Sequence, residues 1–383
     1  MSELKKVLVI VSSPMTINSF LLKHIRLLSS CYDVSVVANF TDVAQLGSIS
    51  DCAKLIPVRI ERKISILRDT AALLKILKII YKGKYNAVHS YTPKAGLLSI
   101  TASYFCFVEN RFHTFTGQVW ANKVGFKKFF LKSLDRFIAK FATQIIVDSH
   151  SQLDFLVSNN VCDRLKSKVF LQGSVSGVDT ERFSPCFSKK IDIRSQYNIK
   201  DSDLIILYLG RLNRDKGLYE LLVAFSILRS KFNNLKLLLV GPDEEGIEEH
   251  FKKTYPSSSF FDDVIFVGYT TTPEIYMQAS DIFCLPSHRE GFGTSVIEAA
   301  SVGLPTVASN IYGLSDAVLD FDTGILFEVG NPNKLSEALE TMISSSEERN
   351  RLALNALLRA RSFFKDDLIS EELLKFYKFH IGL

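Results

Sequence analysis

Long apolar segments are missing from this chain of 383 residues. The longest candidates, residues 73–80 and 97–108, are interrupted by lysine or fall short of the roughly 20 residues that a membrane-spanning helix needs. Residues 1–10 lead directly into a buried strand and lack the long apolar region and small-residue cleavage site of a secretion signal. We therefore expect a cytoplasmic protein that is not integral to a membrane.

Motifs for structural metals, disulfides and dinucleotides are absent as well. The six cysteines are scattered without a C-x-x-C pair, so the sequence predicts neither a zinc site nor a disulfide framework. We expect reduced and mostly buried thiols at Cys31, Cys52, Cys106, Cys162, Cys186 and Cys284. No G-x-G-x-x-G follows the first strand, which argues against a dinucleotide oxidoreductase, and the chain contains no Walker phosphate loop.

Acidic residues are scarce in the first half, although the net charge of the whole chain is only +5. Residues 1–190 contain 27 Lys and Arg against 13 Asp and Glu, whereas residues 191–383 contain 19 against 28. A basic half favours an anionic partner surface, either nucleic acid or a membrane. The alternative is a charge difference without any function.

Short apolar runs alternate with helical patterns, which predicts parallel sheets with helical crossovers. The expected strands are residues 7–11, 34–38, 87–90, 112–115 and 145–148 in the first half, and 204–209, 237–240, 264–267, 282–285 and 306–308 in the second. The length also exceeds that of one ordinary domain. We predict two doubly wound α/β domains, joined around residues 173–190 and facing each other across a cleft. Ligands should bind at the carboxyl ends of the strands.

Residues 281–308 predict a strand, a glycine-containing loop, a helix and a second strand. A loop that enters a helix N-terminus presents unpaired backbone N–H groups and the positive end of the helix dipole, which suits a diphosphate. Glu290 and Glu298 flank this anion site, and their carboxylates can accept hydrogen bonds from sugar hydroxyls. The spacing alone fits an alternative equally well. In it, Ser295 and Glu298 form an S-x-x-E capping box and Glu290 is a solvated loop charge.

Glu290 and Glu298, with Gly291-Phe292-Gly293 between them, closely resemble the E-x7-E signature of the retaining glycosyltransferases of family GT4. Further matches to the family pattern lie at Gly210-Arg211, Lys216-Gly217, Val240-Gly241, residues 266–268 and residues 279–286. The resemblance covers most of residues 200–335 and is looser in the first half. The family often has two glycines in the first loop, where this chain has residues 12–15.

The resemblance implies the GT-B fold, in which two Rossmann-like domains face a cleft. Residues 1–180 would form the acceptor-binding domain and residues 181–363 the nucleotide-sugar-binding domain. Residues 364–383 would form a helix that crosses back to the first domain.

The resemblance also implies roles for the donor-side residues. Glu298 would bind the ribose and Glu290 the hydroxyls of the transferred sugar. Arg211 and Lys216 follow a strand and would neutralise the diphosphate without a metal, unless they form a structural salt bridge. Other expected donor-binding residues are Gly241, Gly268, Gly291, Phe292, Gly293 and Thr294. We interpret Asp201 and Asp203 as a turn before a strand, although D-x-D is a metal motif of the other glycosyltransferase fold.

Several residues of the first half are expected near the acceptor. His113, with Thr116-Gly117 after it, ends a strand at a position that resembles the family histidine beside the sugar. We count His113 with Arg211, Lys216 and Glu290 as catalytic, against the alternative of a structural histidine. His89 also ends a strand and, with Lys94, is expected to line the acceptor side.

Residues 123–141 predict an amphipathic basic helix. Lys128, Lys132 and Arg136 fall on one face, together with Lys140, and phenylalanines fall on the opposite face. We predict that this helix faces an anionic membrane. The alternative is an ordinary helix with its apolar stripe on the core and its charges in water.

These features predict a retaining hexosyl- or N-acetylhexosaminyl-type transferase that moves a sugar from a nucleotide diphosphate, with a UDP-sugar as the expected donor. The expected acceptor is a lipid diphosphate-linked saccharide at the inner face of the cytoplasmic membrane, in bacterial O-antigen (lipopolysaccharide) or capsule assembly. We expect neither a metal cofactor nor a nucleic-acid partner. Two alternatives stay open: a GT-B sugar-nucleotide epimerase and a non-catalytic nucleotide-sugar-binding subunit.

Overall fold

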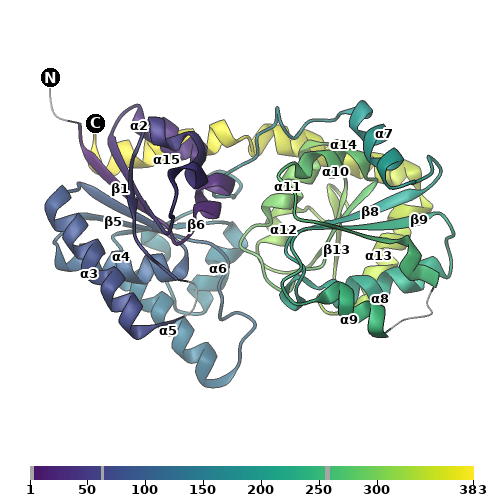
Figure 1. Cartoon of the computed structure of the whole chain (residues 1–383), viewed down its shortest axis with the longest axis horizontal. Coiled ribbons are helices and arrows are strands. Elements are labelled where there is room, and N and C mark those ends of the chain that lie inside the picture. Colours follow the sequence, from purple (N-terminus) through teal and green to yellow (C-terminus); the bar gives the residue numbers. More distant parts are fainter. Residues whose placement is uncertain (1–3, 62–63, 255–258) are drawn as a thin grey trace. The chain divides into compact units, whose positions relative to one another are not determined.

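The computed structural model describes residues 4–61, 64–254 and 259–383 (Figure 1). The chain forms two compact units, Met1–Gly177 together with Asp366–Leu383, and Val178–Lys365. The expected domain boundaries at residues 180 and 363 lie within three residues of these two divisions.

The first unit contains a seven-stranded parallel sheet with the strand order β3-β2-β1-β4-β5-β6-β7. The strands are β1 (Lys6–Ile10), β2 (Asp33–Ala38), β3 (Lys54–Pro57), β4 (Ala87–Tyr91), β5 (Asn110–Phe115), β6 (Gln144–Val147) and β7 (Ser167–Lys168). Successive side chains of β1 enter opposite cores: Val7 and Val9 pack on one face, and Leu8 and Ile10 on the other. Burial on both faces explains the continuous apolar run of this strand.

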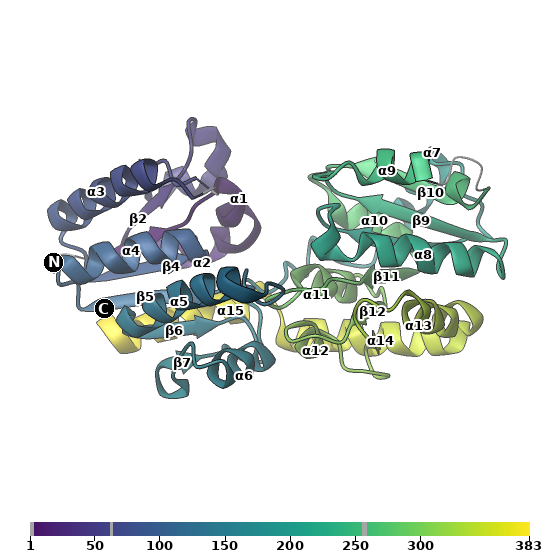
Figure 2. The same cartoon turned by 90° about the horizontal axis from the view of Figure 1, so that it is seen from below.

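Helices cover both faces of this sheet. The core on one face includes residues of α2 (Leu22–Ser29) and α15 (Asp366–Ile381). The opposite face is covered by α3 (Ile66–Gly83), α4 (Pro93–Phe105) and α5 (Gly125–Phe141), which follow one another in Figure 2, and by α6 (His150–Ser158). Shorter helical segments are α1 (Pro14–Thr16), η1 (Ile17–Leu21), η2 (Val43–Asp51) and η3 (Arg164–Lys166).

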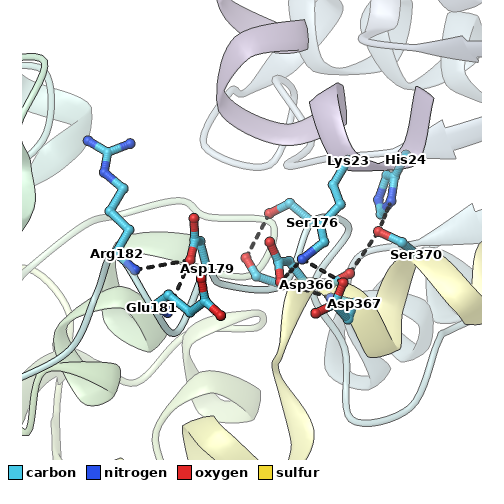
Figure 3. Close-up of polar contacts among 10 residues, drawn as sticks. Lys23, His24, Ser176, Asp179, Glu181, Arg182, Asp366, Asp367 and Ser370 are labelled. Atoms are coloured by element: carbon cyan, nitrogen blue, oxygen red, sulfur yellow. Dashed lines mark hydrogen bonds and ion pairs between the residues drawn. The ribbon is translucent and has the colours of Figure 1, made fainter. Parts of the chain in front are cut away.

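Polar contacts hold the C-terminal helix α15 in the first unit (Figure 3). Lys23 of α2 pairs with Asp366 at 2.8 Å and with Asp367 at 2.6 Å. The next residue, His24, lies 2.8 Å from the Ser370 hydroxyl and is buried, and its burial lowers the pKa of the imidazole to about 4. A neutral histidine therefore joins α2 to the start of α15.

The second unit contains a six-stranded parallel sheet with the order β10-β9-β8-β11-β12-β13. Its strands are β8 (Leu204–Leu209), β9 (Leu235–Val240), β10 (Val264–Gly268), β11 (Ile282–Leu285), β12 (Thr306–Ser309) and β13 (Gly324–Phe327). Its helical segments are α7 (Phe187–Gln196), η4 (Arg214–Lys216), α8 (Leu218–Arg229), α9 (Ile247–Thr254), η5 (Ser259–Asp263), α10 (Pro273–Ala279), α11 (Thr294–Ser301), α12 (Leu314–Ala317), α13 (Pro332–Ser344) and α14 (Ser346–Phe363). The strand order places the carboxyl ends of β8 and β11 side by side.

The predicted architecture of two doubly wound α/β domains is confirmed. Three strands were not predicted, namely β3, β7 and β13, and each lies at an edge of its sheet. None of the helices in the described part of the chain is long and apolar enough to cross a membrane.

Candidate active site

Two loops at the carboxyl ends of β8 and β11 interlock in the second unit. Gly217 has φ of +73°, and a Cβ atom at this position would overlap the carbonyl oxygen of Pro286. Only glycine tolerates both this left-handed conformation and this close approach. The His288 backbone N–H donates to the Asp215 carbonyl at 3.0 Å, so the two loops hold each other in place.

Lys216 and Glu290 form an ion pair between these two loops. Their side chains are only 18% and 15% exposed, so the pair is largely shielded from water. The structure therefore brings together two residues that the sequence predicts for the same site. It also shows that Lys216 faces a carboxylate. A bound diphosphate would therefore either share this lysine with Glu290 or take the place of the Glu290 carboxylate as its partner.

The second predicted cation, Arg211, pairs with Glu244 at 2.8 Å. Asn213 donates to the same carboxylate at 3.1 Å. The side chains of Arg211 and Glu244 are 37% and 34% exposed, and pairs this accessible contribute little to stability. The structure thus realises the salt-bridge alternative for both cations, yet leaves Arg211 accessible to an anionic ligand.

The capping-box interpretation of Glu298 is wrong. Helix α11 begins at Thr294 with Gly293 as its N-cap, in a left-handed conformation with φ of +81° and without a side-chain capping bond. Ser295 therefore lies inside the helix, where it cannot serve as the cap. The first backbone N–H groups of α11 consequently have no side-chain acceptor at the cap position, as an anion-binding helix start requires.

Glu298 lies within α11, and burial raises the pKa of its carboxyl group to about 7. Arg182, which pairs with Glu274 at 2.7 Å, opposes this rise through its positive charge. A half-ionised carboxylate at neutral pH fits a residue that gains partners when a ligand binds, because hydrogen-bond donors favour its charged form.

The other predicted donor residues occupy the same edge of the sheet, with one correction. The Gly241 backbone N–H donates to the Gly268 carbonyl at 2.8 Å. Phe292 is buried and its ring packs 5.3 Å from that of Phe364. Its side chain therefore belongs to the core, and only its backbone remains a candidate for donor contact.

Further polar groups in these loops were not predicted from the sequence. His288 lies 2.9 Å from Glu220 of α8, and this carboxylate raises the pKa of the imidazole. The Ser287 hydroxyl and the Asn213 side-chain oxygen are buried without a hydrogen-bond partner in the described part of the chain. A buried acceptor or hydroxyl is costly when unsatisfied, so these atoms mark places that a ligand or water can fill.

In the first unit, His113 lies inside β5, two residues before the strand ends at Phe115, and does not end the strand as predicted. Its Nδ1 atom is 2.9 Å from the Ser90 hydroxyl, and the close passage of α4 requires Gly96, because a Cβ atom there would overlap the imidazole. Burial lowers the pKa of His113 to about 3, so the ring is neutral. The Ser90 hydroxyl also lies 3.3 Å from the Phe112 carbonyl oxygen, and only 1% of His113 is exposed.

Comparisons with known proteins identify the family of the chain. Residues 189–359 match the family model described as "Glycosyl transferases group 1". The capsular polysaccharide biosynthesis glycosyltransferase CapM of Staphylococcus aureus is 30% identical over 330 residues, which cover 86% of this chain and 85% of that protein. The chain belongs to the group 1 glycosyltransferase family. It is a glycosyltransferase of the GT4 type, as its E-x7-E residues predict.

Two more similarities concern substrate class and fold. The UDP-Gal:alpha-D-GlcNAc-diphosphoundecaprenol alpha-1,3-galactosyltransferase of Escherichia coli is 27% identical over 281 residues, covering 73% of this chain and 71% of that protein. The crystal structure of Anabaena Alr3699/HepE in complex with UDP and glucose superposes with a TM-score of 0.81 at 18% identity, over 98% of this chain and 99% of that one. At this identity the structural likeness shows the GT-B fold alone.

The acceptor role predicted for His89 in this glycosyltransferase is corrected by the structure. His89 has no exposed surface, and its two ring nitrogens lie 2.8 Å from the Tyr377 and Thr114 hydroxyls. It therefore connects β4 and β5 to α15 as a core residue. Lys94 pairs with Asp69 of α3 at 2.8 Å, and Thr116 uses its backbone carbonyl to accept from Gln152 at 2.8 Å. Neighbouring Gly117 is half-buried, and acceptor contacts for these three residues stay predictions.

Helix α5 of the glycosyltransferase exposes its phenylalanine face to solvent, whereas the prediction had the cationic face exposed. Lys132 donates to the Asn159 side chain at 2.8 Å, and Arg136 donates to the Asn160 carbonyl at 2.9 Å, both at the C-terminal end of α6. Cations at a helix C-terminus are favoured by its dipole. Lys128 is half-buried. Lys132 and Arg136 therefore serve contacts within the unit, and phenylalanines occupy the exposed face.

Within the described residues, no cluster of three His, Cys, Asp or Glu side chains is arranged to hold a metal ion. Asp203 is buried and accepts from the Lys200 backbone N–H at 3.2 Å, which agrees with the predicted turn before β8.

Proposed function

We propose that this enzyme transfers a sugar from a UDP-sugar to a hydroxyl of a lipid diphosphate-linked saccharide and retains the anomeric configuration. One observation carries the donor site: the interlocked loops hold Lys216 against Glu290 beside the N-terminus of α11, which has no side-chain cap. Relatives support the substrate class, because CapM takes part in capsular polysaccharide biosynthesis and the Escherichia coli relative acts on a diphosphoundecaprenol-linked sugar.

The proposed chemistry is charge stabilisation around a leaving nucleoside diphosphate. Lys216, Arg211 and the first N–H groups of α11 stabilise the negative charge that develops as the glycosidic bond breaks. Glu290 accepts hydrogen bonds from hydroxyls of the transferred sugar, and Glu298 accepts from the ribose. Retention is generally explained in this family by attack from the face that the diphosphate leaves. The departing phosphate then takes the proton of the acceptor hydroxyl.

In this proposal the first domain binds the acceptor at the inner face of the cytoplasmic membrane. The catalytic role of His113 beside the sugar stays a prediction, because only 1% of this residue is exposed. Because Arg211 and Lys216 supply the positive charge, no metal is required. Activity that is lost in EDTA and restored by Mg²⁺ or Mn²⁺ would contradict this part of the proposal.

A thermal-shift panel with UDP-, GDP- and dTDP-sugars tests the donor. A ligand at 100 times its dissociation constant stabilises a protein by about 2.7 kcal/mol, so the correct nucleotide raises the melting temperature. We expect stabilisation by UDP-sugars in the wild type and much less in Lys216→Ala. Lys231→Ala is the matched control, because Lys231 pairs with Glu340 on an exposed surface of the same unit. Equal shifts in all three proteins would remove Lys216 from the donor site.

A further inference from the structure

Helix α5 carries a row of exposed phenylalanines. Phe126, Phe129, Phe130 and Phe137 are 80%, 63%, 43% and 37% exposed. The spacing of three, four and seven residues places them on one side of the helix. Its opposite side is anchored in the unit, because Asp135 is buried and accepts from the Trp120 indole at 2.7 Å. The helix is therefore fixed in orientation, and its aromatic side faces outward.

The aromatic surface continues onto the end of α4. The ring of Phe137 lies 4.6 Å from that of Phe141, which lies 4.7 Å from Tyr104, and Tyr104 contacts Phe105. Tyr104 and Phe105 are 46% and 65% exposed. We call the set Phe126, Phe129, Phe130, Phe137, Phe141, Tyr104 and Phe105 the aromatic stripe. Exposed apolar side chains gathered along one side of a helix in this way mark an interaction site.

The charges around the aromatic stripe identify its partner. Lys127 and Lys140 are exposed on α5. The first unit as a whole has 26 Lys and Arg against 15 Asp and Glu. Apolar rings bordered by cations complement a bilayer with anionic lipid, where rings enter the acyl boundary and cations contact headgroup phosphates.

We propose that the aromatic stripe inserts into the surface layer of an anionic bilayer, with α5 lying along the interface. Membrane insertion itself does not depend on the proposed function. Only its purpose, which is to bring the first domain to a lipid-linked acceptor, rests on that function. It differs from purely electrostatic attachment, because Lys132 and Arg136 are engaged inside the unit and the phenylalanines make the main contact.

Vesicle binding without donor or acceptor tests the insertion directly. We expect the full chain to co-sediment with vesicles of phosphatidylglycerol and phosphatidylcholine. A part of this binding should persist at 1 M salt, where the Debye length is only about 3 Å. Replacing Phe126, Phe129 and Phe130 together by Ser should weaken binding on the order of 100-fold. The control variant, Leu354→Ser with Leu358→Ser, changes residues of α14 that are 56% and 57% exposed and should bind normally.

A spectroscopic readout excludes an effect of folding. The chain has one tryptophan, the buried Trp120, so Phe129→Trp introduces a single exposed indole. Its fluorescence should shift to the blue with vesicles and be quenched by lipids brominated on the acyl chains. Leu165→Trp, at a position that is 95% exposed outside the stripe, should show neither effect.

Three results would overturn the proposal: no vesicle binding, equal binding by the wild type and the triple serine variant, or an unquenched indole at position 129. A wild type that dimerises in solution and a triple variant that does not would assign the stripe to a second copy instead.

Turnover of a short-chain, water-soluble acceptor separates this proposal from the proposed function. The triple variant should retain that activity, and its absence in the wild type would contradict the transferase proposal alone.

Discussion

Lys216 is the residue whose removal should affect chemistry most. If it stabilises the leaving diphosphate mainly in the transition state, Lys216→Ala should lower kcat on the order of 100-fold with a smaller change in donor affinity. The variant also leaves Glu290 without its ion-pair partner, so its melting temperature must be measured in parallel. A folded variant with unchanged turnover would exclude the assigned role.

Glu298 should make donor binding depend on pH. Its folded-state pKa of about 7 lies well above the usual glutamate value near 4.3, because burial disfavours its charge. In the proposed donor site a ribose hydroxyl donates to the ionised form, so donor affinity should increase about tenfold from pH 6 to pH 8 as Glu298 loses its proton. Calorimetric titration measures this dependence. Glu298→Gln should bind weakly with a flat profile, whereas a profile that stays steep in this variant would assign the titration to another group.

The His288–Glu220 pair should make stability depend on pH. Glu220 raises the folded-state pKa of His288 above its unfolded value, so the pair stabilises below about pH 6.5 and loses this contribution as pH rises through the raised pKa. The side chains are 31% and 21% exposed, which limits the effect to roughly 1 kcal/mol or less.

Thermal melts of wild type and His288→Gln should therefore differ more at pH 6 than at pH 8.5. His250→Gln changes an exposed histidine of the same unit and serves as the control. A difference independent of pH would mean that His288 contributes packing alone.

At the scale of elements, the loop after β8 depends on Gly217. Gly217→Ala should destabilise the second unit, because the new methyl group overlaps the Pro286 carbonyl in addition to the backbone strain. Gly246→Ala is a matched control, since Gly246 has a similar φ of +67° but open space around its Cβ position. Differential scanning calorimetry should show a clearly lower melting temperature only for Gly217→Ala. Equal decreases in melting temperature for the two variants would mean that backbone strain alone destabilises Gly217→Ala and that the two loops can move apart to admit the methyl group.

The sequence predicts central elements better than edge elements. Central strands such as β1 and β8 are buried on both faces and therefore read as apolar runs. The edge strand β7 has only two residues, and β3 ends at Pro57, so neither leaves a periodic pattern. Helix α5 was located correctly, but an amphipathic pattern does not tell which face meets the core. The contacts of Lys132 and Asp135 decide this, and they require the tertiary structure.

In the candidate site, too, local motifs were predictable from the sequence and long-range partners were not. Glu290 and Lys216 were predicted because each lies in a recognisable local motif after a strand. The partners of His288 and Asn213 lie 68 and 31 residues away in the sequence, so only the folded chain reveals them. His89 shows the converse error. Its position at the end of a strand suggests a ligand contact, but α15, nearly 300 residues later in the chain, covers it with Tyr377.

At the scale of the whole molecule, charge is divided between the two units. The first unit has 26 basic and 15 acidic residues, whereas Val178–Lys365 has 20 and 26. The basic unit carries the aromatic stripe, and the acidic unit carries the loops that are proposed to bind the donor. This division fits an enzyme that takes a soluble donor on one domain and a membrane-held acceptor on the other.

The most direct test is transfer from a labelled UDP-sugar to a short-chain lipid diphosphate-linked saccharide, with the anomeric configuration of the product determined by NMR. We predict a product that forms only with the acceptor, keeps the configuration of the donor, forms in EDTA and is reduced on the order of 100-fold by Lys216→Ala. Consumption of the donor to free sugar without an acceptor, or a product with inverted configuration, would contradict the account.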